Sequence, residues 1–309
     1  MAFIMVVGLP GSGKSTFCEN FKLHYPSVKI HSSDAIREEI CTSREDQSKN
    51  EEVFRILHDR LKEDLNKGDD VIFDATNISR KRRKETLRKL KDIPCKKVCM
   101  LIATPYEVCL AQNQNRPYPV PERVINNMYK SFDIPYYYEG WDSIEIIYMN
   151  PNYTNAYGHY KDFIVDTFFF EQHNNNHTLT LGEHCLECYK YIRDNELLVN
   201  NNHTDEIRIA ALLHDNGKPF VKSFTNTKGE PSEFAHFYEH ETIGAYNALF
   251  YTMPEDVDRL YIAILIRWHM LARQMSTFSE TTKEKWLNEF GENLWNDLLI
   301  LHEGDNNAH

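Results

Sequence analysis

The chain has 309 residues, of which 41% are hydrophobic and 26% charged, and this is enough for two domains that each bury a core. No apolar run approaches the roughly 18 residues of a bilayer-spanning helix, and the N-terminal segment lacks the basic region of a signal peptide, which argues against a membrane protein. The 7 cysteines, an odd number without the spacing of a disulfide framework, favour a reducing compartment and hence a cytoplasmic location.

The net charge of -11 is unevenly distributed along the chain. Residues 1–150 carry 23 basic and 22 acidic side chains, whereas the rest of the chain carries 12 and 24. The basic residues of the first half concentrate in one run, namely Arg80, Lys81, Arg82, Arg83, Lys84, Arg88, Lys89 and Lys91. This run could attract a polyanion or could be an ordinary solvated helix face, and both interpretations stay open.

The first half alternates short apolar runs with stretches of helical spacing. We expect strands over residues 3–7, 28–31, 70–74, 97–103 and 144–148, with helices over 14–23, 35–40, 50–66 and the basic stretch after residue 74. Alternating strands and helices predict a mostly parallel sheet with helices on both faces.

A glycine-rich segment follows the first expected strand and precedes the first expected helix. It fits the pattern G-x-x-x-x-G-K-[ST], with Gly8, Gly11, Ser12, Gly13, Lys14, Ser15 and Thr16 as the candidate ligands of a nucleotide. In this pattern the backbone amides surround the phosphates, the lysine neutralises the β and γ phosphates, and the serine hydroxyl binds Mg²⁺. The sequence therefore predicts a site for ATP and Mg²⁺.

Asp34 is the candidate for the group that takes a proton from the phosphoryl acceptor. It follows the second expected strand, so we expect it at the carboxyl edge of the sheet, where ligands of such folds bind. A helix N-cap is the alternative role for this aspartate.

Residues 1–150 resemble the phage polynucleotide 5′-kinase family. The resemblance rests on GLPGSGKST at 8–16, SDAIR at 33–37, DATNISRKRR at 74–83 and RPYPVPERVINNMYKSF at 116–132. It implies that Asp34 is the general base for a 5′-hydroxyl and that Arg37 grips the 3′-phosphate of the acceptor. Arg116 and Arg123 match a lid that closes on the donor phosphates, although either could be a surface residue, and Asp74 is a secondary candidate beside the P-loop strand.

The composition changes after residue 149, where residues 150–178 are rich in Asn, Tyr and His. We expect a domain boundary here, giving a P-loop domain at 1–152 and a second domain at 153–309. The remainder shows helical spacing over 179–198, 207–213, 243–250, 260–266 and 286–301 without strand alternation, so the second domain should be all-α.

Eleven of the 14 histidines lie beyond residue 150, which suggests a metal site. The adjacent pair His214 and Asp215 ends an apolar stretch, and His184 lies within another expected helix. His236 and His240 are four residues apart, which would place both rings on one helical face. Imidazole with carboxylate suits Mn²⁺, Fe²⁺, Co²⁺, Ni²⁺ or Mg²⁺, and the lack of thiolates argues against structural zinc. The two cysteines at 185 and 188 are interpreted as core residues.

Residues 172–309 resemble the HD phosphohydrolase superfamily, on NNNHTLTLGEHCLE at 174–187, AALLHDNGKP at 210–219, FAHFYEHETIGA at 234–245 and LLILHEGD at 298–305. The resemblance implies a first metal held by His184, His214, Asp215 and Asp305, and a second completed by His236 and His240. Lys218 would contact the scissile phosphate, with a helix C-terminal charge as its alternative. His177 and His269 also match histidine positions of relatives, and a packing role stays open for both. Gly304 stands where relatives usually have a small residue, often Ala.

The two resemblances together imply a bifunctional enzyme that heals nucleic-acid ends, with RNA favoured. It would phosphorylate a 5′-hydroxyl with ATP and remove a 3′-phosphate or a 2′,3′-cyclic phosphate, and a ligase could act downstream. One alternative is a small-molecule kinase fused to an HD nucleotidase. Another is a regulator that senses nucleotide and has one inactive half.

Overall fold

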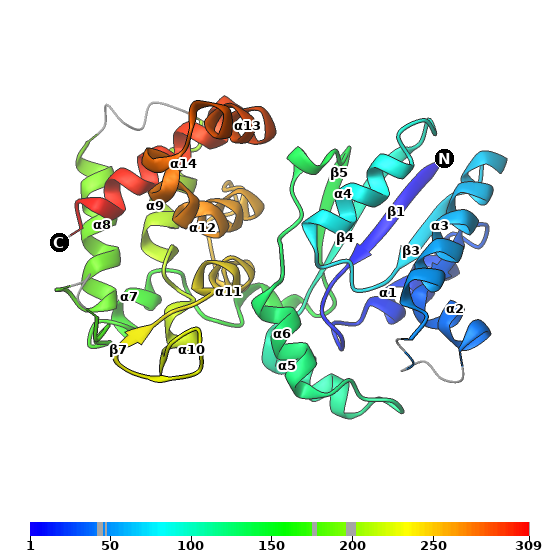
Figure 1. Ribbon diagram of the computed structural model, residues 1–309, viewed down its shortest axis with the longest axis horizontal. Helices are drawn as coiled ribbons and strands as arrows, with labels where there is room; N and C mark the ends of the chain where they lie inside the picture. The colour runs from blue at the N-terminus through cyan, green and yellow to red at the C-terminus, as the bar shows by residue number, and fades with distance from the viewer. Residues whose placement is uncertain (42–45, 47, 175–177, 196–201, 309) are drawn as a thin grey trace. The chain divides into compact units, whose positions relative to one another are not determined.

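The computed structural model describes residues 1–41, 46, 48–174, 178–195 and 202–308, so His177 lies outside the described residues. The chain divides into two compact units (Figure 1). The first contains residues 1–128 and 135–153, and the second contains residues 129–134 and 154–309. Within the described residues, no helix combines the length and the apolar character needed to cross a bilayer.

The first unit is built on a five-stranded sheet in the order β2-β3-β1-β4-β5. Its strands are β1 (Ala2–Val7), β2 (Lys29–Ser32), β3 (Val71–Asp74), β4 (Lys96–Ala103) and β5 (Ser143–Tyr148). All four pairings are parallel, which confirms the α/β prediction. The five strands agree with the sequence prediction, and all but β2, which reads KIHS, are short runs rich in apolar residues.

Helices cover both faces of this sheet. They are α1 (Lys14–His24), α2 (Ser33–Ile40), α3 (Asn50–Lys67), α4 (Arg80–Lys89), α5 (Tyr106–Gln114) and α6 (Glu122–Lys130). Alternate strand residues point to opposite faces. On one face Ile4 and Val6 pack against Cys18 of α1. On the other, the ring of Phe73 meets the Phe54 ring of α3 edge-on, with the ring centroids 6.5 Å apart.

The second unit is helical, as predicted. Its helices are α7 (Asp162–Asp166), α8 (Leu181–Asp194), α9 (Thr204–Leu213), α10 (Lys218–Val221), α11 (His240–Asn247), α12 (Arg259–Gln274), α13 (Glu280–Phe290) and α14 (Glu292–Asn306). Leu213, Ile262 and Leu298 are fully buried. This core supports the ends of the helices that carry the histidines.

Two details of the second unit differ from the sequence prediction. The expected helix over 286–301 is interrupted at Gly291, whose φ of +79° ends α13 and allows α14 to start in a new direction. A short antiparallel hairpin, β6 (Ser223–Thr225) and β7 (Pro231–His236), also lies between α10 and α11. It was not expected because its exposed strands lack a clear alternation of apolar and polar residues.

Candidate active sites

The phosphate-binding loop joins β1 to α1 at the carboxyl edge of the sheet. Gly11 and Gly13 have φ values of +80° and +92°, a conformation that side chains disfavour. A Cβ atom on Gly11 would lie 2.3 Å from the carbonyl oxygen of Cys109 in α5. The glycines are therefore needed both for the curl of the loop and for its close contact with α5.

Lys14 folds back onto this loop. Its Nζ donates hydrogen bonds to the carbonyl oxygens of Gly8, at 3.1 Å, and Leu9, at 2.7 Å. Burial lowers the pKa of Lys14, and the negative charge of Asp74 partly opposes this shift. The ammonium group thus stands at the phosphate site, with its charge balanced by neighbouring oxygens.

A cavity of about 910 Å³ brings together most of the predicted kinase residues. It is lined by Gly11, Gly13, Lys14, Ser15, Thr16, Asp34, Arg37, Asp74 and Arg116, among others. Of the predicted nucleotide ligands in the described chain, Gly8, Ser12 and Arg123 do not line it. Ser12 is buried within the loop, whereas Arg123 is exposed in the first turn of α6.

Asp34 does not cap α2. Ser32 is the N-cap residue, and its hydroxyl accepts a hydrogen bond from the backbone N–H of Asp34 at 3.3 Å. The Asp34 carboxylate instead forms an ion pair with Arg37, with Oδ1 and Nη1 2.8 Å apart. The side chain of Asp34 is 47% exposed and that of Arg37 only 7%, so the carboxylate is accessible from the cavity while its guanidinium partner is buried.

The sheet register places Asp74 beside this pair. Asp74 is paired with Ser32 of β2 on one side and with Val6 of β1 on the other. Burial raises the pKa of the Asp74 carboxyl, and the ammonium group of Lys14 works against the increase. The carboxyl edge therefore gathers two carboxylates, Asp34 and Asp74, with Lys14 and Arg37.

Arg116 belongs to a segment that a buried side chain holds in place. The amide of Asn113 donates to the carbonyl oxygen of Val120 at 2.8 Å and accepts from the Val120 N–H at 2.9 Å. These two bonds close the loop that carries Arg116 and the prolines of RPYPVP. The sequence analysis did not identify Asn113, because an asparagine within a helix gives no local sign of such a role.

The basic run on α4 is not one solvated face. Arg83 is fully buried, and its guanidinium forms a two-point ion pair with Glu139 at 2.8 and 2.6 Å. Trp141 adds a hydrogen bond to the same carboxylate at 3.1 Å. Arg83 therefore cannot meet a ligand in solution, whereas Arg82 lines the cavity described above.

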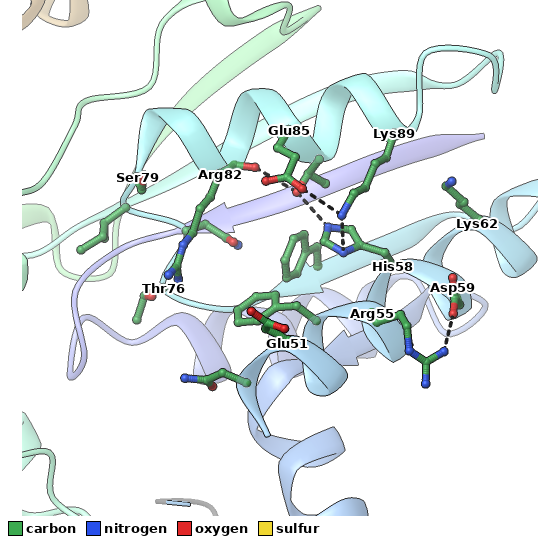
Figure 2. Close-up of a pocket in the computed structure, with 16 residues that line it drawn as sticks. Glu51, Arg55, His58, Asp59, Lys62, Thr76, Ser79, Arg82, Glu85 and Lys89 are labelled. Carbon is green, nitrogen blue, oxygen red and sulfur yellow. Dashed lines mark hydrogen bonds and ion pairs between the residues drawn. The ribbon is translucent and has the colours of Figure 1, made fainter. Parts of the chain in front are cut away.

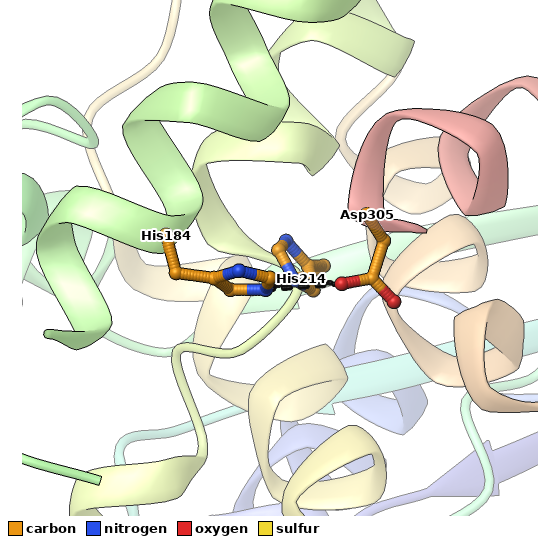
Figure 3. A group of neighbouring side chains, drawn as sticks. All are labelled: His184, His214 and Asp305. Atoms are coloured by element: carbon orange, nitrogen blue, oxygen red, sulfur yellow. Dashed lines mark hydrogen bonds and ion pairs between the residues drawn. The ribbon is translucent and has the colours of Figure 1, made fainter. Parts of the chain in front are cut away.

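In the second unit, three predicted metal ligands converge from different helices (Figure 3). The Nε2 atom of His184, on α8, lies 3.0 Å from Oδ1 of Asp305 on α14. The Nε2 atom of His214, at the end of α9, lies 3.2 Å from that of His184 and 3.5 Å from Asp305 Oδ1. These three side chains form the first trio.

Asp215 contacts the first trio and also belongs to a second one. One oxygen, Oδ2, lies 3.4 Å from His214 Nε2, and the other, Oδ1, lies 3.2 Å from His240 Nε2. The third member is His269 on α12, whose Nε2 lies 3.3 Å from that of His240. Asp215 thus stands between the two groups with one oxygen toward each.

His236 is not in either trio, and the prediction that it shares a helical face with His240 is wrong. His236 ends β7, and α11 begins only at His240, because Glu239 has a φ of +66° and turns the chain. The His236 ring contacts the Ser232 hydroxyl and stacks on Tyr238. His269 lies in the second trio instead, with its Nε2 3.9 Å from Asp215 Oδ1, so a metal-ligand role joins the packing role that was open for it.

The orientation of the four clustered histidines fits metal binding. In each ring Nδ1 contacts a backbone carbonyl oxygen, that of Ala308 for His184, Ala211 for His214, Phe237 for His240 and Ile266 for His269. A proton on Nδ1 leaves a lone pair on Nε2, and the Nε2 atoms are the ones that converge. Neighbouring lone pairs 3.2–3.3 Å apart repel unless a cation lies between them. The residues therefore suit one or two divalent ions.

The charges of the cluster support the same conclusion. Burial would lower the pKa of His214, but Asp215 and Asp305 outweigh it and raise that pKa well above the ordinary value. Burial likewise would raise the pKa of Asp305, but its contacts with the His184 and His214 rings hold it well below its usual range. The carboxylates thus require positive charge at this point.

Lys218 supplies part of that charge. It is buried at the start of α10, with its Nζ 2.6 Å from Asp215 Oδ2 and 2.6 Å from the side-chain oxygen of Gln172. This position excludes a role as an exposed C-terminal helix charge. Gln172 is a further residue that the sequence analysis missed.

The two cysteines of α8 are buried, as predicted, but Cys185 is not remote from the cluster. Its Sγ belongs to a group with His214 and Asp215. Burial raises the pKa of the Cys185 thiol to about 12, so the protonated thiol is a poor ligand at neutral pH.

Two glycines bring the halves of this site together. A Cβ atom on Gly217 would lie 2.0 Å from the carbonyl oxygen of His240. One on Gly244 would lie 2.2 Å from Oδ1 of Asn216. The segment that follows Asp215 therefore contacts α11 directly, and this contact sets the distance between Asp215 and His240.

Comparison with known proteins finds a family model that matches part of each unit. Residues 3–135 match the family described as AAA domain, and residues 181–299 match the family described as HD domain. The first range contains the phosphate-binding loop, and the second contains His184, His214, His240 and His269.

Curated relatives match about half of the chain. L-seryl-tRNA(Sec) kinase of Methanococcus maripaludis is 32% identical over 148 residues, which cover 46% of this chain and 57% of the relative. Protein kti12 of Schizosaccharomyces pombe is 28% identical over 157 residues, covering 46% of this chain and 55% of the relative. The chain thus spans little more than half the length of these relatives. A chain in the structure of the Pnkp1/Rnl/Hen1 RNA repair complex is 20% identical with a TM-score of 0.39, covering 42% of this chain and 43% of that one.

Proposed function

We propose that this chain, a P-loop kinase-like domain followed by an HD domain, is an enzyme that heals nucleic-acid ends. The first domain, residues 1–152, transfers the γ-phosphoryl group of ATP to a 5′-hydroxyl. The second, residues 153–309, removes a 3′-phosphate or opens and removes a 2′,3′-cyclic phosphate. The two products, a 5′-phosphate and a 3′-hydroxyl, are the ends that a ligase joins.

The observation that carries the kinase assignment is the Asp34–Arg37 pair in the cavity of Lys14. A carboxylate suits a hydroxyl that must lose a proton, and an adjacent guanidinium suits a phosphate on the same acceptor. A nucleotide at the 5′ end of a strand carries both groups, whereas a free nucleoside or sugar lacks the phosphate. The pair therefore favours an acceptor with a 3′-phosphate, such as the 5′ end of a strand, over a free nucleoside or a sugar.

In the transfer, the acceptor hydroxyl oxygen forms a bond to the γ-phosphorus, and the bond from that phosphorus to the β–γ bridging oxygen breaks. Asp34 accepts the hydroxyl proton, and ADP leaves. Lys14 and Arg116 balance the charge on the phosphate oxygens, and Mg²⁺ on the Ser15 hydroxyl would add to that balance.

The HD assignment rests on the two trios and on Asp215, which belongs to the second and contacts His214 of the first. A divalent ion held there, Mn²⁺, Fe²⁺, Co²⁺, Ni²⁺ or Mg²⁺, would stabilise charge on the phosphate oxygens and activate water. Lys218 adds a cation beside Asp215 that can contact the phosphate of the substrate. The same arrangement suits a terminal phosphate and a cyclic phosphate, because both present two or more unesterified oxygens.

RNA is the favoured nucleic acid. The matched relative from Methanococcus maripaludis is by name a kinase of a tRNA-linked substrate, which supports an acceptor that includes RNA. Cleaved RNA also presents both lesions that the two domains would repair.

The test is radiolabel transfer from ATP to a 5′-hydroxyl RNA with a 2′,3′-cyclic phosphate, compared with a free nucleoside. We expect transfer to the RNA and cyclic-phosphate removal with a transition metal. Asp34→Ala should abolish only the transfer and Asp215→Ala only the phosphate removal. Equal transfer to the nucleoside would instead support a small-molecule kinase, and unchanged activity in both variants would contradict the assignment of chemistry.

A further inference from the structure

A second cavity, of about 610 Å³, lies between α3 and α4 in the first unit (Figure 2). Its size is within the range of about 300–1,000 Å³ that is usual for small-molecule sites. It shares four lining residues with the kinase cavity, namely Asn50, Phe54, Thr76 and Arg82. The two cavities are therefore neighbours that share part of their walls.

One wall of this second cavity is aromatic. Phe54 and His58 of α3 and Phe73 of β3 lie with ring centroids 6.0–6.5 Å apart. The Arg82 guanidinium stands 5.9 Å from the centroid of Phe54, at the boundary shared with the kinase cavity. Aromatic faces with an arginine are the surface on which single-stranded bases stack.

A chain of hydrogen bonds holds the His58 ring in this wall. Lys89 Nζ contacts Nδ1 at 3.5 Å, and Nε2 lies within hydrogen-bond distance of the Thr86 hydroxyl, at 3.0 Å. Thr86 in turn donates to the carbonyl oxygen of Arg82 at 3.1 Å. Burial, and then the charge of Lys89, lower the pKa of His58, so the ring is neutral at pH 7. The wall is thus formed before a ligand arrives.

The charged residues around the opening leave positive charge available for a phosphate. Arg55 pairs with Asp59 at 3.2 Å, and Lys89 pairs with Glu85 at 3.2 Å. In the part of the chain that the structure describes, neither Lys62 nor Arg82 forms an ion pair with a carboxylate. With Glu51 as the remaining acid, the lining keeps an excess of positive charge.

A series of hydrogen bonds connects Asp34, the candidate base, with the lining of this second cavity. Asp34, the base, pairs with Arg37, and Arg37 Nη2 donates to Oδ1 of Asn50 at 2.9 Å. Asn50 lines both cavities. A strand whose 5′-hydroxyl lies at Asp34 and whose first phosphate lies at Arg37 is therefore directed, by its next nucleotide, past Asn50.

We propose that the cavity between α3 and α4 binds the second nucleotide of a single-stranded acceptor, with its base on the Phe54–His58 wall and its phosphate near Lys62 and Arg82. This inference rests on the proposed kinase function and adds a substrate requirement to it. The enzyme should distinguish a strand from a mononucleotide, although both carry a 5′-hydroxyl and a 3′-phosphate.

The kinetic test compares a nucleoside 3′-monophosphate with a 5′-hydroxyl RNA dinucleotide that carries a 3′-phosphate. One stacked base predicts a KM about tenfold lower for the dinucleotide. Lys62→Ala with Lys89→Ala should raise the dinucleotide KM about tenfold and change that of the monophosphate less than twofold. The matched control, Lys22→Ala with Lys67→Ala, removes the same charge from exposed positions outside both cavities and should leave both values unchanged.

A binding test separates this inference from the kinase activity. An oligonucleotide with 2-aminopurine as its second base should lose fluorescence on binding without ATP, and one with the label at a distant position should not. Equal KM values for the two acceptors, or unquenched fluorescence of the bound second base, would overturn the second-nucleotide site while leaving the kinase proposal intact. Absence of transfer to every acceptor would instead overturn the proposed kinase function, and this inference with it.

Discussion

Gly217→Ala should inactivate the HD site without removing any of its ligands. The new Cβ would stand 2.0 Å from the carbonyl oxygen of His240, whereas real Cβ contacts are essentially never shorter than 3.0 Å. The segment after Asp215 and the start of α11 must therefore separate by about 1 Å or more. His240 Nε2 and Asp215 Oδ1 are now 3.2 Å apart, and the shift acts directly on that distance.

A displacement of about 1 Å at a catalytic group costs about 100-fold in rate. We therefore expect the removal of 3′-phosphate to fall about 100-fold in Gly217→Ala, and titration with Co²⁺ to show weaker binding. Phosphoryl transfer from ATP, measured on the same protein, should stay within twofold of wild type. The retained transfer shows that the first unit is folded, and near-ultraviolet circular dichroism checks the second.

The matched control is Gly304→Ala, next to Asp305. There the added Cβ would lie 2.7 Å from Cγ1 and Cδ1 of Ile192 and 3.2 Å from the Cys188 sulfur, which are side-chain atoms rather than backbone. A side chain can change its rotamer where a backbone carbonyl cannot, and alanine favours the helix over glycine by about 1 kcal/mol. Phosphatase activity should be retained in this variant. A folded Gly217→Ala protein with wild-type phosphatase activity and Co²⁺ affinity would refute the argument that this backbone contact sets the ligand geometry.

Three further outcomes follow from the structure. Asp34→Ala should lower kcat of phosphoryl transfer by about 10²–10⁴-fold, the usual contribution of a general base, and leave the KM for ATP unchanged. A comparable rise in the KM for ATP with an unchanged kcat would contradict the assignment. Arg83→Met should destabilise the first unit by about 3–5 kcal/mol in urea unfolding because Glu139 stays buried without its partner, and adding Glu139→Leu should recover most of the loss. His269→Ala should weaken the second of two Mn²⁺ binding events in calorimetry more than the first, whereas equal weakening of both would exclude a ligand role confined to the second trio.

The sequence predicted the parts of the fold that depend on local patterns. Four of the five strands of the first unit were found because each is rich in apolar residues over a short run, and the phosphate-binding loop because its glycines follow directly on β1. The break at Gly291 was missed because the apolar spacing continues across it, and spacing alone does not report a left-handed backbone conformation.

The candidate sites likewise contain some residues that the sequence predicts and others that it does not. Lys14, Asp34 and Arg37 lie in one cavity because parallel strands end at a common edge, which topology predicts. His236 was misassigned because a spacing of four residues indicates one face only within a helix, and Glu239 turns the chain between the two histidines. The place of His269 depends on contacts with His240 and Asp215 on elements distant in the chain, and the role of Asn113 depends on how the loop after its helix folds back, which no local pattern reveals. The α3–α4 cavity likewise requires the packed structure.

The two hydrogen bonds from Lys14 to the carbonyl oxygens of Gly8 and Leu9 have a consequence for nucleotide binding. An incoming phosphate group must offer oxygen acceptors in place of these carbonyl oxygens, or leave the buried ammonium group poorly solvated. A triphosphate can do so while its other groups contact the amides of the loop. Release of the lysine from the loop carbonyls is thus coupled to occupation of the loop by the nucleotide.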